Sequence, residues 1–91
     1  MRFEWNERKR LSNAEKHGLD FLDAELVFRG RHFHYPSPRH DEDRWVTVGL
    51  LEGREVAVVW TARDDAVRLI SFRRARHEER RRYRELYGRG A

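Results

Sequence analysis

The arginines near the C-terminus are the residues of this sequence best suited to binding a charged ligand. The segment 70–87, ISFRRARHEERRRYRELY, begins like an apolar strand and continues as a helix rich in arginine. Residues 73–91 carry eight Arg and three Glu, so the whole excess of the net charge of +4 lies there. A clustered cationic helix is typical of a protein that binds a polyanion. The alternative is a solvated helix face with a few Glu–Arg pairs.

Other reactive side chains are fewer. The sequence has no Cys, which excludes disulfides, thiolate zinc sites and cysteine nucleophiles. His32 and His34 share a strand face, but no third ligand is indicated, so we expect no metal and no cofactor. The N-terminal residues lack the apolar region of a signal peptide, and the longest apolar run, 56–60, is too short to span a membrane. We therefore expect a cytoplasmic protein.

Ninety-one residues, of which 12% are aromatic, predict a single domain, 1–91, with a modest core. Periodicity and turn residues predict the order strand, two helices, strand, three-stranded meander, helix. The expected elements are strands at 2–5, 31–35, 45–51, 55–62 and 66–72, and helices at 6–17, 20–29 and 75–86. The predicted class is α+β: a small antiparallel sheet, with the 55–62 strand in the centre, and two N-terminal helices and a C-terminal helix packed on it.

The helix faces can also be predicted. In the first helix we expect Leu11 and Ala14 to face the core. Lys9, Asn13 and Lys16 lie at i, i+4 and i+7, which places them together on a polar face. The second helix has an apolar stripe of Phe21, Ala24, Val27 and Phe28. For the last helix we expect a buried stripe made of Ala75, Tyr83, Leu86 and Tyr87.

Two separated groups of residues resemble the signatures of the BrnT family. The first group is Phe3-Glu4-Trp5-Asn6, Lys9, Asn13, Lys16-His17-Gly18, Phe21 and Ala24. The second group is Thr61-x-Arg63, Arg68, Ile70-Ser71-x-Arg73-x-Ala75 and Glu79-Arg80-x-x-Tyr83. The resemblance covers nearly the whole chain. It departs at Phe72, where many relatives have Ala, and in the loop 36–44, which is poorly patterned in the family.

The resemblance implies a toxin of a type II toxin–antitoxin system with a RelE-like fold. Such toxins are endoribonucleases that cleave RNA and inhibit translation. The partner implied is a ribbon-helix-helix antitoxin, which neutralises the toxin and brings it to operator DNA.

Metal-independent RNA cleavage uses the ribose 2′-OH as the nucleophile on the adjacent phosphate. The site must accept the 2′-OH proton, stabilise the phosphorane and protonate the leaving oxygen. Arginine stays protonated, so its role is to hold the phosphate and stabilise charge. Arg73 is the first candidate. Arg63 ranks below it, because two antiparallel neighbouring strands would place these arginines at opposite ends, and Arg63 could simply pair with Asp64 or Asp65.

Arg80, Tyr83 and His17 complete the candidate catalytic residues. Tyr83 could orient the substrate or stack on a base, although core packing is an alternative. His17 could act as acid or base, or could cap the end of its helix. Glu79 is better explained as an ion-pair partner of Arg76 or Arg82 than as a base. The candidate RNA-binding residues are Arg74, Arg76, Arg81, Lys9 and Lys16, of which the two lysines could instead contact the antitoxin.

Two other kinds of function remain open at this stage. One is a non-enzymatic nucleic-acid-binding regulator that inserts the basic helix into a groove. The other is a catalytically inactive module that binds a partner protein. Cleavage of RNA by the isolated chain separates the ribonuclease from both.

Overall fold

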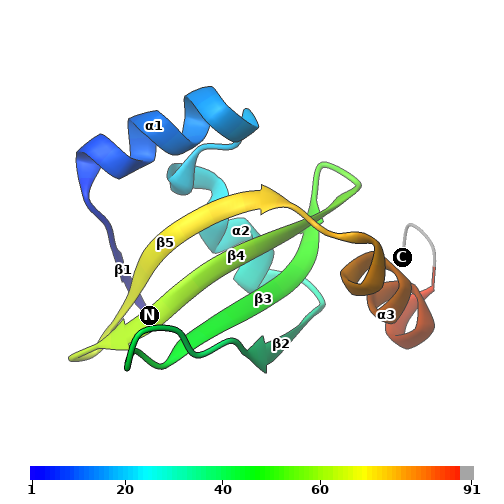
Figure 1. Ribbon diagram of the computed structural model, residues 1–91. Coiled ribbons are helices and arrows are strands. Elements are labelled where there is room, and N and C mark those ends of the chain that lie inside the picture. Colours follow the sequence, from blue (N-terminus) through cyan, green and yellow to red (C-terminus); the bar gives the residue numbers. More distant parts are fainter. Residues whose placement is uncertain (89–91) are drawn as a thin grey trace.

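The computed structural model describes residues 1–88, so Arg89, which belongs to the basic C-terminal segment, lies outside the described residues. The chain is an α+β domain, as predicted (Figure 1). Its elements are β1 (Arg2–Glu4), α1 (Glu7–His17), the 3-10 turn η1 (Phe21–Asp23), α2 (Ala24–Arg29), β2 (His32–Pro36), β3 (Arg44–Leu51), β4 (Arg54–Arg63), β5 (Ala66–Arg74) and α3 (His77–Tyr87).

The five strands form one sheet in the order β1-β5-β4-β3-β2. The most apolar strand, β4, lies in the centre, which confirms the prediction from its composition. Neighbours from β5 to β2 are antiparallel, but β1 pairs parallel with β5, with Arg2 opposite Ala66. The prediction of a wholly antiparallel sheet is therefore wrong. Only a hairpin forces neighbouring strands to be antiparallel, and β1 meets β5 through a long connection.

Helices cover both faces of the sheet (Figure 1). On the first face, η1 and α2 pack over a core made of Phe21, Ala24, Val27, Val56, Val58, Val67, Leu69 and Phe72. On the second face, α3 packs over Val46, Val48, Ala57, Ala75 and Tyr83. Gly49 allows α2 to approach closely, because a Cβ there would lie 2.8 Å from Cγ1 of Val27. The predicted stripe of the second helix is confirmed, although the helix begins as a 3-10 turn.

A bulge in β5 decides which of its side chains face α3. Val59 is opposite Ser71 and Trp60 is opposite Leu69, so Ile70 has no partner on β4. One extra residue reverses the alternation of side chains along a strand. As a result Leu69 and Phe72 both enter the first core, although they are three residues apart. Arg73 then lies on the second face, opposite Ala57 and beneath α3.

Helix α1 begins and ends where the sequence predicts, but its buried face differs from the prediction. The side chain of Asn6 accepts a hydrogen bond from the N–H of Lys9 at the start, and Gly18 adopts φ 69° at the end. Leu11, expected in the core, is 57% exposed, whereas Asn13, expected on the polar face, is buried. Lys9 and Lys16 are exposed as expected.

Asn13 is buried because it completes the edge of β5. Its Nδ2 donates to the carbonyl of Phe72 at 2.8 Å, and its Oδ1 accepts from the N–H of Phe72 at 3.1 Å. The paired strand β1 reaches only to Arg68, so the β5 backbone beyond that point needs another partner. The side-chain amide supplies both a donor and an acceptor and so replaces a neighbouring strand.

The face of α3 that meets the sheet is given by Glu79, Tyr83 and Tyr87, at i, i+4 and i+8. Ala75 is buried just before the helix, and Leu86, predicted to be buried, is 47% exposed because it lies off this stripe. Within residues 1–88, no helix is long and apolar enough to cross a membrane.

Candidate functional site

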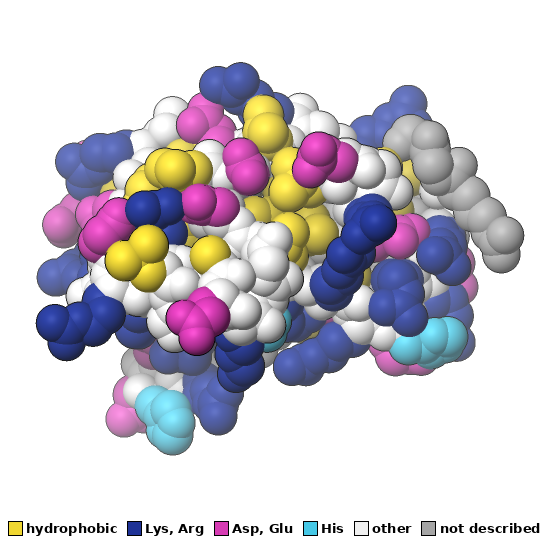
Figure 2. Space-filling model, turned by 90° about the horizontal axis from the view of Figure 1, so that it is seen from above, with side chains coloured by type: hydrophobic (Ala, Val, Ile, Leu, Met, Phe, Trp, Pro, Cys, Tyr) yellow, Lys and Arg dark blue, Asp and Glu magenta, His cyan; other side chains and the backbone are white. Residues whose placement is uncertain are grey.

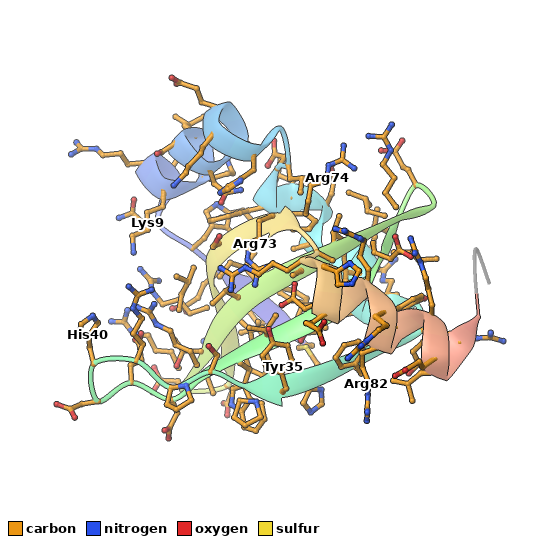
Figure 3. The ribbon with its side chains drawn as sticks, turned by 45° about the vertical axis from the view of Figure 1, so that its right-hand side comes forward. Lys9, Tyr35, His40, Arg73, Arg74 and Arg82 are labelled. Atoms are coloured by element: carbon orange, nitrogen blue, oxygen red, sulfur yellow. The ribbon has the colours of Figure 1, made fainter. Side chains whose placement is uncertain are left out.

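Arg73 lies at the end of β5, and its guanidinium is held by the carboxylate of Glu79 in the first turn of α3. Nη1 lies 2.8 Å from Oε1 and Nη2 lies 3.0 Å from Oε2, a bidentate pair. The side chains are only 13% and 5% exposed. The hydroxyl of Tyr35, from β2, donates to Oε2 of the same carboxylate. We call Tyr35, Arg73 and Glu79 the Arg73 cluster, of which Tyr35 and Arg73 are labelled in Figure 3.

The carboxylate of Glu79 is the centre of this cluster. It also accepts from the backbone N–H of Arg76 at 2.7 Å, at the start of α3. Burial by itself would raise the pKa of Glu79, but the hydrogen bonds from Arg73, Arg76 and Tyr35 outweigh it and lower that pKa. The hydrogen bond to Glu79 raises the pKa of Arg73 against the effect of burial. Both groups are therefore charged at neutral pH.

Arg73 is largely buried, but its guanidinium is not fully used by the protein. It donates three hydrogen bonds, two to Glu79 and one to the carbonyl of Arg74 at 3.1 Å. A guanidinium has about five N–H donors. Arg73 thus keeps about two donors for another acceptor, in an orientation that Glu79 fixes.

His17, at the end of α1, lies within electrostatic reach of Arg73. Burial lowers the pKa of His17, and the positive charges of Lys16 and Arg73 lower it further. The imidazole is therefore neutral at pH 7 and has a nitrogen able to accept a proton. Of the five candidate catalytic residues, His17 is therefore the one whose pKa responds to the charge of Arg73.

Arg63 lies far from Arg73. In the register of β4 and β5, Arg63 is opposite Ala66, whereas Arg73 is opposite Ala57. Six residues of strand separate the two positions, or about 20 Å. The side chain of Arg63 is exposed, and it forms no ion pair with Asp64 or Asp65 in the described part of the chain.

Arg80 and Tyr83 point in different directions from α3. Tyr83 is 1% exposed, and its hydroxyl donates to the carbonyl of Arg31 at 3.3 Å. Burial raises the pKa of Tyr83. The ring thus packs in the second core. Arg80 donates to the carbonyl of Ala75 at 2.6 Å and lines a hollow on the outer side of α3.

The five candidate RNA-binding residues are all exposed: Lys9, Lys16, Arg74, Arg76 and Arg81. Lys9 and Lys16 lie on α1. Arg74 lines a hollow near Gly18 and Arg54, on the other side of β5 from Arg73. Arg81 forms an ion pair with Glu78 at 2.6 Å. Seen from above, several Lys and Arg side chains lie close together over α3 (Figure 2).

Sequence reasoning missed Tyr35 and assigned Glu79 to the wrong partners. Glu79 binds the side chain of Arg73 and only the backbone of Arg76, and it forms no ion pair with Arg82 in residues 1–88. One signal was available for Glu79, since a Glu in the third position of a helix often accepts from the backbone at its start. Nothing local in the sequence joins Tyr35 to Glu79, because 44 residues separate them.

Two more arginines lie on the second face of the sheet, because Arg44, Thr61 and Arg68 are opposite one another in register. Arg68 forms an ion pair with Glu4 at 2.9 Å, and Arg44 forms one with Glu42 at 2.6 Å. Among the described residues, no group of three or more His, Cys, Asp or Glu side chains is arranged to hold a metal ion.

A comparison with protein-family models identifies one match. The family of BrnT ribonuclease toxins of type II toxin–antitoxin systems matches residues 5–79. The chain belongs to this family. The match to the BrnT model includes His17, Arg63, Arg73 and Glu79, whereas Arg80, Arg81 and Tyr83 follow its last residue. Searches of curated proteins and of solved structures found no match.

Proposed function

We propose that this BrnT-family toxin is a metal-independent endoribonuclease in which the ribose 2′-OH attacks the adjacent phosphate. The observation that carries the proposal is an arginine that Glu79 orients and whose charge lowers the pKa of a neutral histidine. Glu79 fixes Arg73 with about two donors free, and burial, together with the charges of Lys16 and Arg73, keeps His17 unprotonated. Metal-free cleavage needs these two groups: a cation for the phosphate and a base for the 2′-OH proton.

In this proposal the scissile phosphate binds the free N–H groups of Arg73. His17 accepts the 2′-OH proton as the oxygen attacks phosphorus. The negative charge that develops on the phosphorane is stabilised by Arg73, which does not need to reorganise because Glu79 already holds it. The P–O5′ bond then breaks, which leaves a 2′,3′-cyclic phosphate; the 5′-oxygen takes a proton from water, and His17 returns to that water the proton it accepted. We place three of the candidates outside the reacting site. Arg63 is too distant, Arg80 points to another side of α3, and Tyr83 is buried in the second core.

The protein has two basic surfaces near this site that are available to contact the RNA backbone. Arg44 and Arg68 lie on the same sheet face as Arg73. The exposed residues of the two helices, Lys9, Lys16, Arg74, Arg76 and Arg81, flank it. Phosphate contacts of this kind position RNA without reading its sequence.

We further propose a RelE-like fold, action on cytoplasmic RNA that inhibits translation, and neutralisation by a ribbon-helix-helix antitoxin that alone carries the toxin to operator DNA. A type II family implies a protein antitoxin. Exposed leucines on α1, η1 and α2, namely Leu11, Leu22 and Leu26, offer apolar surface to such a partner.

The decisive experiment uses purified protein and a short RNA. We expect cleavage in the presence of EDTA, no cleavage when the scissile nucleotide carries a 2′-deoxyribose, and growth arrest with RNA degradation when the chain is expressed alone. His17→Ala should lose cleavage, and Arg29→Ala, which removes an exposed arginine of α2, should keep it. Intact RNA and normal growth at verified soluble expression would contradict the proposal, and retained binding to duplex DNA would then favour a non-enzymatic regulator.

A further inference from the structure

A second hollow adjoins the Arg73 cluster and has no role in the mechanism above. It lies between β2 and α3 and has a volume of about 420 Å³. Its walls are Phe33, His34 and Tyr35 from β2 and Glu78, Glu79 and Arg82 from α3. Tyr35 and Glu79 belong to both the hollow and the Arg73 cluster. Volumes of this order hold small ligands.

Flat, polarisable groups line the hollow. The rings of Phe33 and Tyr35 lie on the same side of β2, with centroids 6.4 Å apart and planes 26° apart. They offer an aromatic surface of the kind on which nucleobases stack. Arg82 is exposed on the α3 side, and a planar guanidinium can cover the second face of a stacked ring. Figure 3 shows Tyr35 and Arg82 projecting from these two elements.

The polar edge of the hollow has two carboxylates, Glu78 and Glu79, and Glu78 keeps more of its capacity to accept hydrogen bonds. Both oxygens of Glu79 already accept hydrogen bonds from Arg73, and one also accepts from Tyr35. Glu78 is different: its side chain is 70% exposed, and within residues 1–88 it accepts one hydrogen bond, from Arg81 to Oε2. A carboxylate accepts and does not donate. A ligand read by Glu78 must therefore present N–H groups.

Among the four RNA bases, guanine presents two adjacent N–H donors on its pairing edge, N1–H and the 2-amino group. These match the two oxygens of one carboxylate. Adenine and cytosine each place a ring acceptor beside their amino group, and uracil places its single N–H between two carbonyls, so each would set an acceptor against the carboxylate. Stacking does not discriminate between the bases, whereas hydrogen bonds from the pairing edge to a carboxylate do.

We propose that the hollow between β2 and α3 is a guanine subsite for the nucleotide beside the scissile phosphate, with Phe33 and Tyr35 as the stacking surface and Glu78 as the specificity-determining residue. The inference rests on the proposed function, because Tyr35 and Glu79 connect the hollow to the arginine that would hold the phosphate. A base in the hollow therefore lies next to the reacting phosphate.

The first test measures kcat/KM on short RNAs that differ at the nucleotide beside the cleaved bond. We expect guanine to be preferred, and inosine, which lacks the 2-amino group, to react roughly tenfold more slowly. Glu78→Gln should abolish the difference between guanine and inosine. Glu85→Gln removes the same charge about two turns further along the same helix, outside the lining of the hollow, and should preserve it. A preference that Glu78→Gln leaves unchanged, or no preference at all, overturns the subsite.

The second test does not depend on cleavage. Guanosine monophosphate is titrated into the full chain and followed by NMR, with the adenosine, cytidine and uridine monophosphates as competitors. We expect guanosine monophosphate to shift the resonances of Phe33, Tyr35 and Arg82 more than the others do. The same shifts in a protein that leaves RNA intact would uphold the subsite and reject the ribonuclease. Equal shifts from all four nucleotides, or shifts confined to other surfaces, would reject the subsite.

Discussion

The ion pair between Arg73 and Glu79 makes a sharp prediction about stability. Arg73→Ala leaves the carboxylate of Glu79, 5% exposed, without its opposite charge. Removing one partner of a buried pair costs about 3–5 kcal/mol. Glu79 keeps its bonds from the N–H of Arg76 and from Tyr35, so we expect the lower end, about 3 kcal/mol. For a domain of this size that lowers Tm by roughly 12–24 °C.

The assay is urea unfolding of a double-mutant cycle. Arg73→Ala and Arg73→Ala/Glu79→Gln are compared with the wild type and Glu79→Gln. Because the double variant buries no unpaired charge, we expect it to be more stable than Arg73→Ala, with a coupling of about 1–3 kcal/mol. Arg29→Ala is the control, because its ion pair with Glu25 is exposed, and an exposed pair contributes about 1 kcal/mol at most.

The same pair predicts a dependence on pH. The pKa of Glu79 is lower in the folded protein than in the unfolded chain. Its contribution is therefore fully present above the usual Glu pKa and is lost as pH falls through the lowered value. Glu79→Gln should remove this loss. If Arg73→Ala unfolds at the same urea concentration as Arg29→Ala, the reasoning about the pair is refuted. If it is destabilised as expected, loss of toxicity by Arg73→Ala alone does not identify a catalytic residue.

Three further predictions concern other residues. Asn13→Ala leaves the N–H and C=O of Phe72 unpaired, which should cost about 2–4 kcal/mol in urea unfolding; an effect as small as that of Ser12→Ala would contradict the edge-completing role. Because the pKa of His17 lies below 6.5, kcat/KM should be level near pH 7 and fall in acid; a pH profile that His17→Gln leaves unchanged would exclude this base. RNA affinity should fall steeply with salt, and Arg76→Ala should reduce the slope of log K against log[salt] by about one. A flat slope for the wild type would contradict RNA binding through the basic surface.

Local features of the sequence were sufficient to predict most helices and strands and the family. Asn6 and Gly18 mark the ends of α1 because capping depends on neighbouring residues alone. The apolar run in β4 predicts its central place because burial on both faces needs such a run. The residues that resemble the BrnT signatures include Arg73 and His17, which were selected from the sequence, and also Glu79, which was instead assigned to Arg76 or Arg82.

Contacts between distant residues were decided only by the tertiary structure. The bulge at Ile70 reverses the alternation of β5, so that Phe72 enters the first core and Arg73 faces α3, and no local pattern indicates where a strand inserts an extra residue. Asn13 is buried and Leu11 is exposed, the reverse of the prediction, because β1 stops at Glu4 and the backbone of Phe72 needs another partner. Glu79 binds Arg73 and Tyr35 because the register of the sheet and the position of α3 bring them together. Pairing across such separations depends on the whole packed arrangement, which helical or strand periodicity does not encode.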